Sequence, residues 1–345
     1  MPAQATFLGA LDAVAREALT AVSRQVSFAP GATLVRQGQF TLGAYVLEAG
    51  TVEAFVSLPG GQSMKVAELS DGAVFGEMAL IERGVCSATV IARTAVTGWY
   101  IGGDDFRATV ASRNSGALEI QRTLARNLAD KLHALNAKIA GHPASEDSPD
   151  DGAVPQGDPL AGIVRSKEAS FDWRAFLPVL PFFDGFDAFE IDEMVASASV
   201  LELPRDAWLF AAGQPAQACY LVVRGAVEVF TRAGGRRRRV AIAGPGELVG
   251  YMSALRGDPH GANARVREGA CVLEIPREPF LALYNGSSSV AVSLLHGIHR
   301  SLLRAMARTN TQLTRLITHS RLNAAAAAEA ELESALHGQI WRSAE

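Results

Sequence analysis

The sequence predicts a mainly β fold with flanking helices: two β jelly-roll barrels, each followed by an α-helix, and a long C-terminal helix. Three observations predict this class. One pattern of residues occurs twice along the chain, short alternating apolar runs within each copy are separated by Gly and Pro, and an apolar stripe at helical spacing follows each copy. Many short strands are typical of barrels and sandwiches, whereas apolar spacings of three, four and seven residues are typical of amphipathic helices.

The repeat is clearest at residues 44–55, which read AYVLEAGTVEAF and correspond to CYLVVRGAVEVF at residues 219–230. The offset there is 175 residues. After one deletion it becomes 174, and Gly76 then matches Gly250. A spacing that holds over about 70 residues with a single gap indicates two copies of one module.

Each copy begins with a predicted helix, over residues 8–23 in the first and 188–197 in the second. Glycine pairs between apolar runs, at Gly60-Gly61 and Gly234-Gly235, indicate hairpin tips. The stripe after the first copy consists of Leu118, Leu124, Leu128, Leu132, Leu135 and Ile139, and the stripe after the second includes Leu294, Ile298, Leu302, Met306 and Leu313. We expect each stripe to cover its own barrel. The longer helix has no obvious partner within the chain past residue 305, so we expect a homodimer through this C-terminal helix.

Residues 141–175 are predicted to be a flexible acidic linker, because the segment contains Pro and Gly and lacks apolar periodicity. The predicted domains are therefore residues 1–140 and residues 176–305. Residues 306–345 are predicted to form a C-terminal helical extension.

The composition excludes several classes of protein. The chain has 345 residues, 48% of them hydrophobic, which is enough for two domains with cores, and no apolar run reaches the length of a membrane span. No secretory signal is recognisable, and the three cysteines lack the spacing of a disulfide framework or a zinc site, so we expect a cytoplasmic protein. The net charge of −4 argues against a generally basic nucleic-acid binder.

Catalysis is not expected from this sequence. No Ser-His-Asp or paired-carboxylate arrangement can be placed, and most of the seven histidines lie on predicted helices rather than on strands, where a cupin-like metal site would need them. We therefore predict a protein that is not an enzyme and that has no metal site and no cofactor.

Residues 75–90, FGEMALIERGVCSATV, are the most informative segment. A glycine at a strand end opens a short apolar turn, followed by a loop of small residues and a β-branched strand, which directs unpaired backbone N–H groups at an anion. The order F-G-E-[aliphatic]-A-L, then a loop and S-A-T-V, resembles the phosphate-binding cassette of cyclic nucleotide-binding domains. These domains are found in catabolite activator proteins, protein kinase A regulatory subunits and cyclic nucleotide-gated channels. The resemblance covers residues 7–140 and 180–305 and implies jelly-roll barrels of this type.

The resemblance implies a site for cAMP or cGMP in the first module, formed by Gly76, Glu77, Met78, Ala79, Leu80, Cys86, Ser87 and Ala88. Gly76 allows close backbone approach in the family, and Glu77 stands at the position of the carboxylate that binds the ribose. Ala79 and Leu80 stand where backbone amides of the family face the phosphate.

Cys86 stands where the family has the arginine that pairs with the cyclic phosphate. Losing one such charge-assisted contact costs about 1.5–3 kcal/mol, which weakens binding roughly 10- to 150-fold. Three interpretations of Cys86 are open: a small filler in a site that no longer binds nucleotide, a wall of a site that binds weakly or binds another ligand, and a redox-sensitive thiol. Arg83 could reach the anion instead, although we expect it to be exposed to solvent.

The second module departs further from the family at its pocket residues Gly250, Tyr251, His260 and Gly261. Tyr251 replaces the glutamate, and His260 replaces the arginine. An unperturbed histidine is mostly neutral at pH 7 and pairs poorly with a phosphate. The second pocket is therefore predicted to bind no nucleotide.

The four arginines Arg236–Arg239 follow the second glycine pair. They are expected to form a solvated hairpin, and the other interpretation is a docking surface for an anionic partner protein or nucleic acid. Nothing nearby supplies aromatic stacking or a recognition helix, so nucleic acid is not expected as a partner.

Two functions are consistent with these features. The first is a non-catalytic regulatory protein that senses a cyclic nucleotide or related anionic ligand through the first module and passes this signal to a partner protein. The second is a ligand-independent scaffold or adaptor built from two degenerate modules. Glu77 favours the first function, whereas Cys86, Tyr251 and His260 favour the second.

Overall fold

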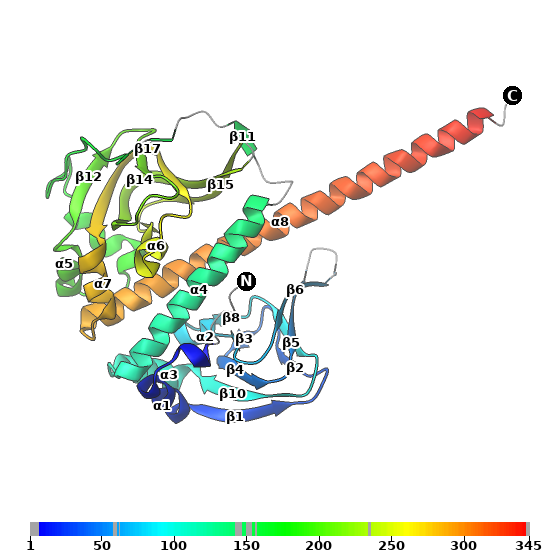
Figure 1. Ribbon diagram of the computed structural model, residues 1–345, viewed down its shortest axis with the longest axis horizontal. Helices are drawn as coiled ribbons and strands as arrows, with labels where there is room; N and C mark the ends of the chain where they lie inside the picture. The colour runs from blue at the N-terminus through cyan, green and yellow to red at the C-terminus, as the bar shows by residue number, and fades with distance from the viewer. Residues whose placement is uncertain are drawn as a thin grey trace.

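The computed structural model describes residues 7–57, 61, 63–141, 147–149, 154–155, 157–233 and 236–342. The predicted hairpin tips at Gly60 and at Gly234-Gly235 lie outside these residues. The described chain forms two β-rich modules, the first at the bottom of Figure 1 and the second at its upper left, with helices between them. The predicted class, mainly β with flanking helices, is confirmed.

Two four-stranded sheets form the first module, and alternate side chains of their strands fill the space between them. Leu47, Val52, Phe75 and Val90 belong to this inner core, and Tyr45 stacks on Phe75 with ring centroids 5.2 Å apart. One sheet has the order β1 (Ser23–Phe28), β10 (Val96–Gly102), β4 (Gly43–Ala49) and β7 (Val74–Phe75); the other has the order β2 (Thr33–Val35), β9 (Thr89–Ala92), β5 (Val52–Ser57) and β6 (Ser63–Leu69); β3 (Phe40–Thr41) pairs with β8 (Gly84–Val85).

Helices flank these sheets at the predicted places. Asp12 begins the first α-helix, where its side chain accepts a hydrogen bond from the amide of Ala15 at 2.8 Å and so satisfies one of the unpaired donors of the first turn. The helical elements of the first module are η1 (Leu8–Ala10), α1 (Ala13–Ala21), α2 (Met78–Ile81), α3 (Gly103–Ala111) and α4 (Ser115–Gly141).

The second module repeats this strand order with longer strands. The 16-residue β14 covers the positions of both β4 and β5, and β17 covers those of β9 and β10. Its strands have the order β11 (Asp147–Pro149), β15 (Arg236–Ala243), β14 (Ala218–Ala233), β17 (Asn263–Pro276) and β12 (Ser199–Leu203), with β13 (Trp208–Phe210) on β17 and β16 (Leu248–Val249) on β14. Because the long strands pass from one layer to the other, they join both layers into one sheet. The order of the described strands has two separate ends, so they do not form the closed barrel that was predicted.

The helices of the second module lie before, within and after its sheet. A capping box begins α5, since the side chain of Asp187 accepts from the amide of Glu190 and that of Glu190 accepts from the amide of Asp187. The elements are η2 (Arg174–Val179), η3 (Pro181–Phe183), α5 (Ala188–Val195), α6 (Tyr251–Arg256), α7 (Arg277–Asn285) and α8 (Ser289–Arg342).

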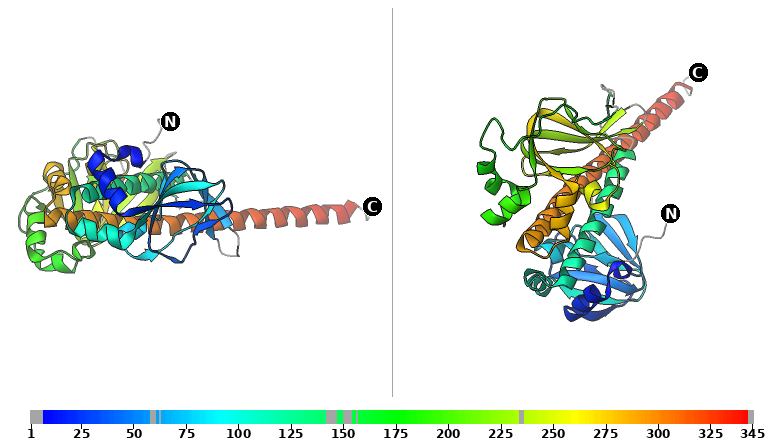
Figure 2. Two further views of the ribbon diagram at one scale, coloured as in Figure 1. Left: turned by 90° about the horizontal axis from the view of Figure 1, so that it is seen from below. Right: turned by 60° about the vertical axis from the view of Figure 1, so that its left-hand side comes forward.

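The two long helices α4 and α8 pack against each other between the modules (Figures 1 and 2). Their apolar stripes belong to one core cluster that reaches into both modules, with Leu124, Leu128, Leu294 and Ile298 fully buried. The expectation that each stripe covers only its own barrel is therefore wrong. Periodicity identifies the apolar face of a helix but not what packs on it.

The second half of the predicted flexible linker packs against the second module. Leu160 is 2% exposed and Trp173 is 4% exposed, and Ser166 exchanges two backbone hydrogen bonds with Val200, at 2.7 and 3.1 Å. Apolar side chains spaced more widely than a helix or strand period anchor this stretch. Residues 159–175 therefore pack on the second module and are not part of a flexible linker, contrary to the prediction.

The C-terminal extension is continuous with the helix before it. α8 runs through residue 305 without a break and leaves the body of the molecule as a single rod (Figure 1).

Buried His299 makes the packing of α4 and α8 sensitive to pH. Its Nε2 lies 3.0 Å from the backbone oxygen of Gln121, and complete burial lowers the pKa of its imidazole to about 4, below the ordinary value of 6.5. Between pH 6.5 and pH 4 the imidazole is therefore protonated in the unfolded chain but neutral in the folded chain. As a result, the free energy of unfolding falls by about 3 kcal/mol as the pH falls through this window. We expect His299→Gln to remove this part of the pH dependence in urea unfolding followed by circular dichroism between pH 7.5 and pH 4. An unfolding free energy with the same pH dependence in both proteins would contradict this assignment.

Candidate functional site

The cassette of the first module begins where β7 ends. Gly76 has a φ of 72°, and a Cβ there would lie 3.0 Å from the backbone oxygen of Gly43, so only glycine fits both the conformation and the space. The chain then enters the short helix α2, whose residues Ala79, Leu80 and Ile81 are buried. The local fold of the cassette thus follows from its sequence.

The backbone amides of Ala79 and Leu80 do not face outward in this structure. They donate to the carbonyl oxygens of Gly76 and Glu77, at 3.0 and 3.1 Å, within the turn itself. Ala79 also accepts a hydrogen bond from Arg107 through its backbone oxygen. An anion would therefore have to compete with the helix for the amides that were expected to bind the phosphate.

Glu77 is 7% exposed and forms an ion pair with Lys131 of α4. The same ammonium group lies 3.4 Å from the backbone oxygen of Val74, the first residue of β7. A buried carboxylate needs a partner, and here the partner comes from a helix 54 residues further along the chain. Sequence reasoning missed Lys131, although its position beside Leu128 and Leu132 on the apolar stripe of α4 was a signal that it faces the first module.

Cys86 lines a cavity of about 290 Å³ at one end of the sandwich. Its amide donates to the backbone oxygen of Gln39 at 2.8 Å, and its own oxygen accepts from Gly38 at 2.9 Å, so the two loops hold each other in place. The cavity is lined by Thr33, Leu34, Val35, Arg36, Gln39, Phe40, Thr41, Leu42, Tyr45, Cys86 and Tyr100.

The expected site residues are only partly brought together. Glu77 is not among the residues that line the cavity, Ser87 is exposed, and Ala88 packs on the inner core of the sandwich. Met78 is half-buried and packs against the core cluster that contains the helices.

The thiol of Cys86 has a raised pKa because burial disfavours the thiolate, although a hydrogen bond with Thr41 acts in the opposite direction. A redox sensor needs a lowered pKa, so the structure does not support that interpretation. Arg83 is 73% exposed and pairs with Asp104 through two contacts of 2.9 and 3.0 Å. It does not replace the missing arginine.

An aromatic stack occupies the corresponding part of the second module. His260 lies flat on Phe210, with ring centroids 3.7 Å apart and an interplanar angle of 9°, and burial lowers the pKa of its imidazole to about 4. By the offsets of the repeat, Phe210 corresponds to Val35 and His260 to Cys86, two residues that line the cavity of the first module. The larger rings take up this space, and the imidazole is neutral at pH 7.

The remaining residues of the second pocket differ in burial: Tyr251 is in the core, Gly250 is half-buried and Gly261 is exposed. Gly250 has a φ of 78°, and a Cβ there would lie 3.0 Å from His260. Tyr251, which replaces the glutamate, is 6% exposed, and burial raises the pKa of its hydroxyl. Gly261 lies beside His133 of α4, which a Cβ would approach to 3.5 Å.

α4 contacts both cassettes through neighbouring residues. Asp130 accepts a hydrogen bond from Arg256, the last residue of α6, at 2.8 Å, while Lys131 pairs with Glu77. Successive residues of a helix point about 100° apart, so one turn of α4 touches the two modules on different sides.

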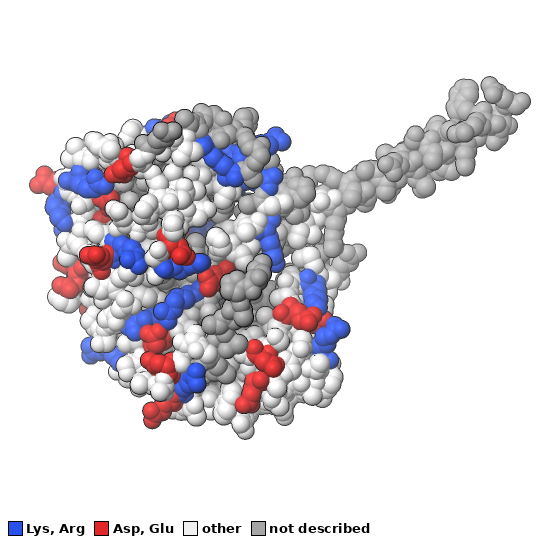
Figure 3. All heavy atoms as spheres, in the orientation of Figure 1, with Lys and Arg blue, Asp and Glu red and all other residues white. Residues whose placement is uncertain are grey.

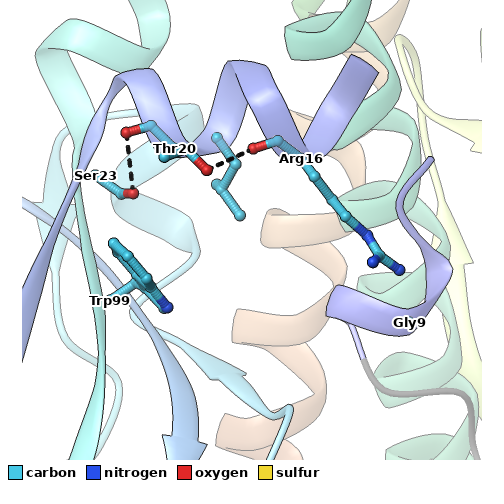
Figure 4. Close-up of a pocket in the computed structure, with 6 residues that line it drawn as sticks. Gly9, Arg16, Thr20, Ser23 and Trp99 are labelled. Carbon is cyan, nitrogen blue, oxygen red and sulfur yellow. Dashed lines mark hydrogen bonds between the residues drawn. The ribbon is translucent and has the colours of Figure 1, made fainter. Parts of the chain in front are cut away.

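A second cavity, of about 270 Å³, lies between α1 and β10 beside Trp99 (Figure 4). Its polar side chains bond within the chain: Arg16 donates to the oxygen of Leu11 at 3.0 Å, Thr20 to that of Arg16 at 2.8 Å, and Ser23 to that of Thr20 at 3.4 Å. These bonds assign the polar groups a structural role.

The residues that the structure describes contain no group of three or more His, Cys, Asp or Glu side chains that could hold a metal ion. None of their helices is long and apolar enough to cross a membrane.

Comparison with known proteins agrees with the repeat. The family model of the cyclic nucleotide-binding domain matches residues 25–113 and 200–287, one match in each module. The chain is 36% identical over 126 residues to the cyclic AMP receptor protein of Thermus thermophilus, covering 36% of this chain and 58% of that protein. It is 34% identical over 97 residues to a cAMP-dependent protein kinase regulatory subunit of Candida albicans, covering 28% of this chain and 20% of that protein. The chain thus spans less than two thirds of the length of these relatives.

Among solved structures, the regulatory domain of Toxoplasma gondii PKA, crystallised with cAMP, covers 83% of this chain and 88% of its own length. Its sequence identity is 18% and its TM-score is 0.31.

The pair of Glu77 and Lys131 can be tested by a double-mutant cycle. Lys131→Met leaves a buried carboxylate without its cation, and we expect the free energy of unfolding to fall by about 1–2 kcal/mol. This loss is smaller than that for a fully buried pair, because Lys131 is 38% exposed. Adding Glu77→Gln should restore most of this loss. The measurement is urea unfolding at pH 7, with Lys138→Met on the exposed side of α4 as the matched control. Additive effects of the two substitutions would show that the pair does not interact.

Proposed function

The chain belongs to the cyclic nucleotide-binding domain family, and on this basis we propose that it is a non-catalytic regulatory protein whose first module binds cAMP or cGMP and passes the signal to a partner protein. The observation that carries the proposal is Glu77. It is retained at the ribose position of the cassette, and its partner Lys131 lies on the helix that joins the two modules.

The ion pair supplies a mechanism for the signal. A ribose hydroxyl that donates to Glu77 competes with Lys131 for the carboxylate, and the cyclic phosphate attracts the ammonium group that is released. α4 then changes its contacts, and because Asp130 holds Arg256 and the oxygen of Gln121 meets His299, the change reaches α6 and α8. Differential affinity of the ligand for the two arrangements drives this shift.

The second candidate function is a ligand-independent scaffold or adaptor. It is favoured by the stack of His260 on Phe210 and by Cys86, which together leave neither module with the family's arginine. In this function the ion pair of Glu77 and Lys131 only holds α4 against the cassette of the first module, and the surfaces of the modules bind the partner.

We also propose that the protein is cytoplasmic. Residues 1–140 form its first domain, residues 176–305 together with the packed residues 159–175 form its second, and residues 306–345 form an extension that pairs two copies. The modules share one hydrophobic core through α4 and α8, so experiments on the whole chain are preferable to experiments on residues 1–141 alone.

Calorimetric titration of the full chain with cAMP and with cGMP tests the ligand. We expect binding in the micromolar range, loss of binding in Glu77→Ala, and binding that is roughly 10- to 150-fold tighter in Cys86→Arg, because the guanidinium restores one charge-assisted contact. His260→Gln, in the second module, should leave the affinity unchanged. If only Cys86→Arg binds, the adaptor function replaces the sensor function, and if no variant binds, the first module has no nucleotide site.

The oligomeric state tests the C-terminal helix. We expect a dimer in light scattering coupled to size exclusion at micromolar concentration. We expect a monomer when residues 320–345 are removed, because the part of the helix that is proposed to pair with a second copy is then missing. Circular dichroism of the shortened chain should report intact β-structure. A monomer at full length would overturn this part of the proposal.

A further inference from the structure

A row of four side chains crosses one sheet of the first module and forms part of the wall of the cavity beside Cys86. Arg24, Tyr100, Tyr45 and Phe75 lie opposite one another on β1, β10, β4 and β7, so they project from the same face. The guanidinium carbon of Arg24 lies 4.8 Å from the ring centroid of Tyr100, and the rings of Tyr100 and Tyr45 meet edge to face at 5.1 Å. The two tyrosines in the middle of the row line the cavity.

The cavity carries a positive charge and hydrogen-bond donors. Its described lining residues include one arginine, Arg36, and no acidic side chain. Within the described part of the chain, Arg36 forms no ion pair and the hydroxyl groups of Tyr45 and Tyr100 have no hydrogen-bond partner. Burial raises the pKa of the Tyr45 hydroxyl, which therefore stays protonated and can donate. The cavity thus offers a cation and two hydroxyl donors to an anion and has no carboxylate to repel it.

The loop that carries Arg36 is held in place by hydrogen bonds. The amide of Gln37 donates to the hydroxyl of Thr89 at 3.0 Å, and the side-chain oxygen of Gln37 accepts from the amide of Ser57 at 2.6 Å. The next two residues pair with the backbone of Cys86, as described above. A backbone fixed in this way loses little conformational freedom when a ligand binds.

Apolar side chains lie at the exposed part of the same cavity. Phe40 and Leu42 line it and are 75% and 73% exposed. Val85, opposite Phe40 on β8, is 49% exposed. Apolar and aromatic walls with a few polar groups are typical of small-molecule sites, so these side chains favour a ligand with an apolar ring.

The arginine-rich hairpin of the second module offers no comparable site. Basic side chains gather on the part of this module where β14 and β15 lie (Figure 3). Arg237, however, is 5% exposed, forms an ion pair with Glu228, and lies over the ring of Phe230 with its guanidinium carbon 4.2 Å from the ring centroid. The prediction that Arg236–Arg239 form a solvated hairpin is therefore wrong for Arg237, because its side chain is built into the module.

From these contacts we propose that the cavity of the first module binds a small aryl phosphate and that Arg36 is the cation that pairs with it. The hydroxyls of Tyr45 and Tyr100 donate to the phosphate, which has more oxygens to accept these donors than a carboxylate has. Phe40 packs on the aromatic ring. The site goes beyond the proposed nucleotide function, because Glu77 does not line it and no ribose is needed.

Calorimetric titration of the full chain with phenyl phosphate tests the site. We expect a dissociation constant on the order of 0.1–1 mM for a ligand this small. Arg36→Gln should weaken binding at least about tenfold, because a charge-assisted contact is lost. Arg93→Gln is the matched control, since Arg93 is 59% exposed, pairs with Glu53 and does not line the cavity, and it should leave the affinity unchanged.

Two further ligands and one further variant test the aromatic part of the site. Phenyl phosphate should bind about two- to tenfold more tightly than cyclohexyl phosphate, which lacks the π-system, and phenol, which lacks the anion, should bind more weakly than either. Phe40→Ala should reduce the preference for the phenyl ring. Because Phe40 is largely exposed, this variant is expected to fold, and circular dichroism of each variant checks that the sheets are intact.

Three results would overturn the assignment: no binding of phenyl phosphate at millimolar concentration, binding that Arg36→Gln leaves unchanged, and equal affinity for phenyl and cyclohexyl phosphate. The nucleotide titration reads a different ligand, so the two proposals fail separately. A chain that binds phenyl phosphate through Arg36 but binds no cyclic nucleotide overturns the sensor function and supports this site. A chain that binds only the nucleotide overturns this site alone.

Discussion

The arrangement of the two modules depends on α4, a helix that belongs to the first module and is buried between both. Its apolar stripe packs on α8, and its polar residues contact the two cassettes, Lys131 at Glu77 and Asp130 at Arg256. Removing α4 from this position would expose Leu124 and Leu128 and leave the carboxylate of Glu77 without its cation. Burial of these side chains therefore fixes the distance between the cassettes, and any change at one of them is constrained by the other.

The two modules have departed from the family in different physical ways. The first keeps an open cavity and its carboxylate but has a cysteine in place of the cation. In the second, Phe210 and His260 stack where the first module has Val35 and Cys86, so packed rings occupy the space that is a cavity in the first module. A filled pocket stabilises its module without a ligand, whereas an empty polar cavity contributes little to stability. This difference is the reason to look for ligand binding in the first module only.

Features set by local sequence were predictable, and long-range pairings were not. The repeat, the mainly β class and the position of the cassette follow from glycines and alternating apolar residues such as those of residues 44–55 and 219–230. Lys131 and Glu77 are 54 residues apart, and nothing in the sequence states that they meet. The same holds for the shared core of α4 and α8, since a stripe shows that a face is buried but not against which element. The pairing of the amides of Ala79 and Leu80 was also not predictable, because the sequence does not show that the turn before α2 brings the carbonyl oxygens of Gly76 and Glu77 within hydrogen-bond distance of them.

The unbroken course of α8 gives the molecule a mechanical property. The helix is rooted in the shared core at Leu294 and Ile298 and continues to Arg342 as one rod. At 1.5 Å per residue, the part beyond residue 305 is roughly 55 Å long, so a tilt of about 5° at its base displaces its tip by about 5 Å. A small repacking of α4, one that leaves both sheets unchanged, can therefore move the C-terminal end of α8 by a distance comparable to the length of a side chain.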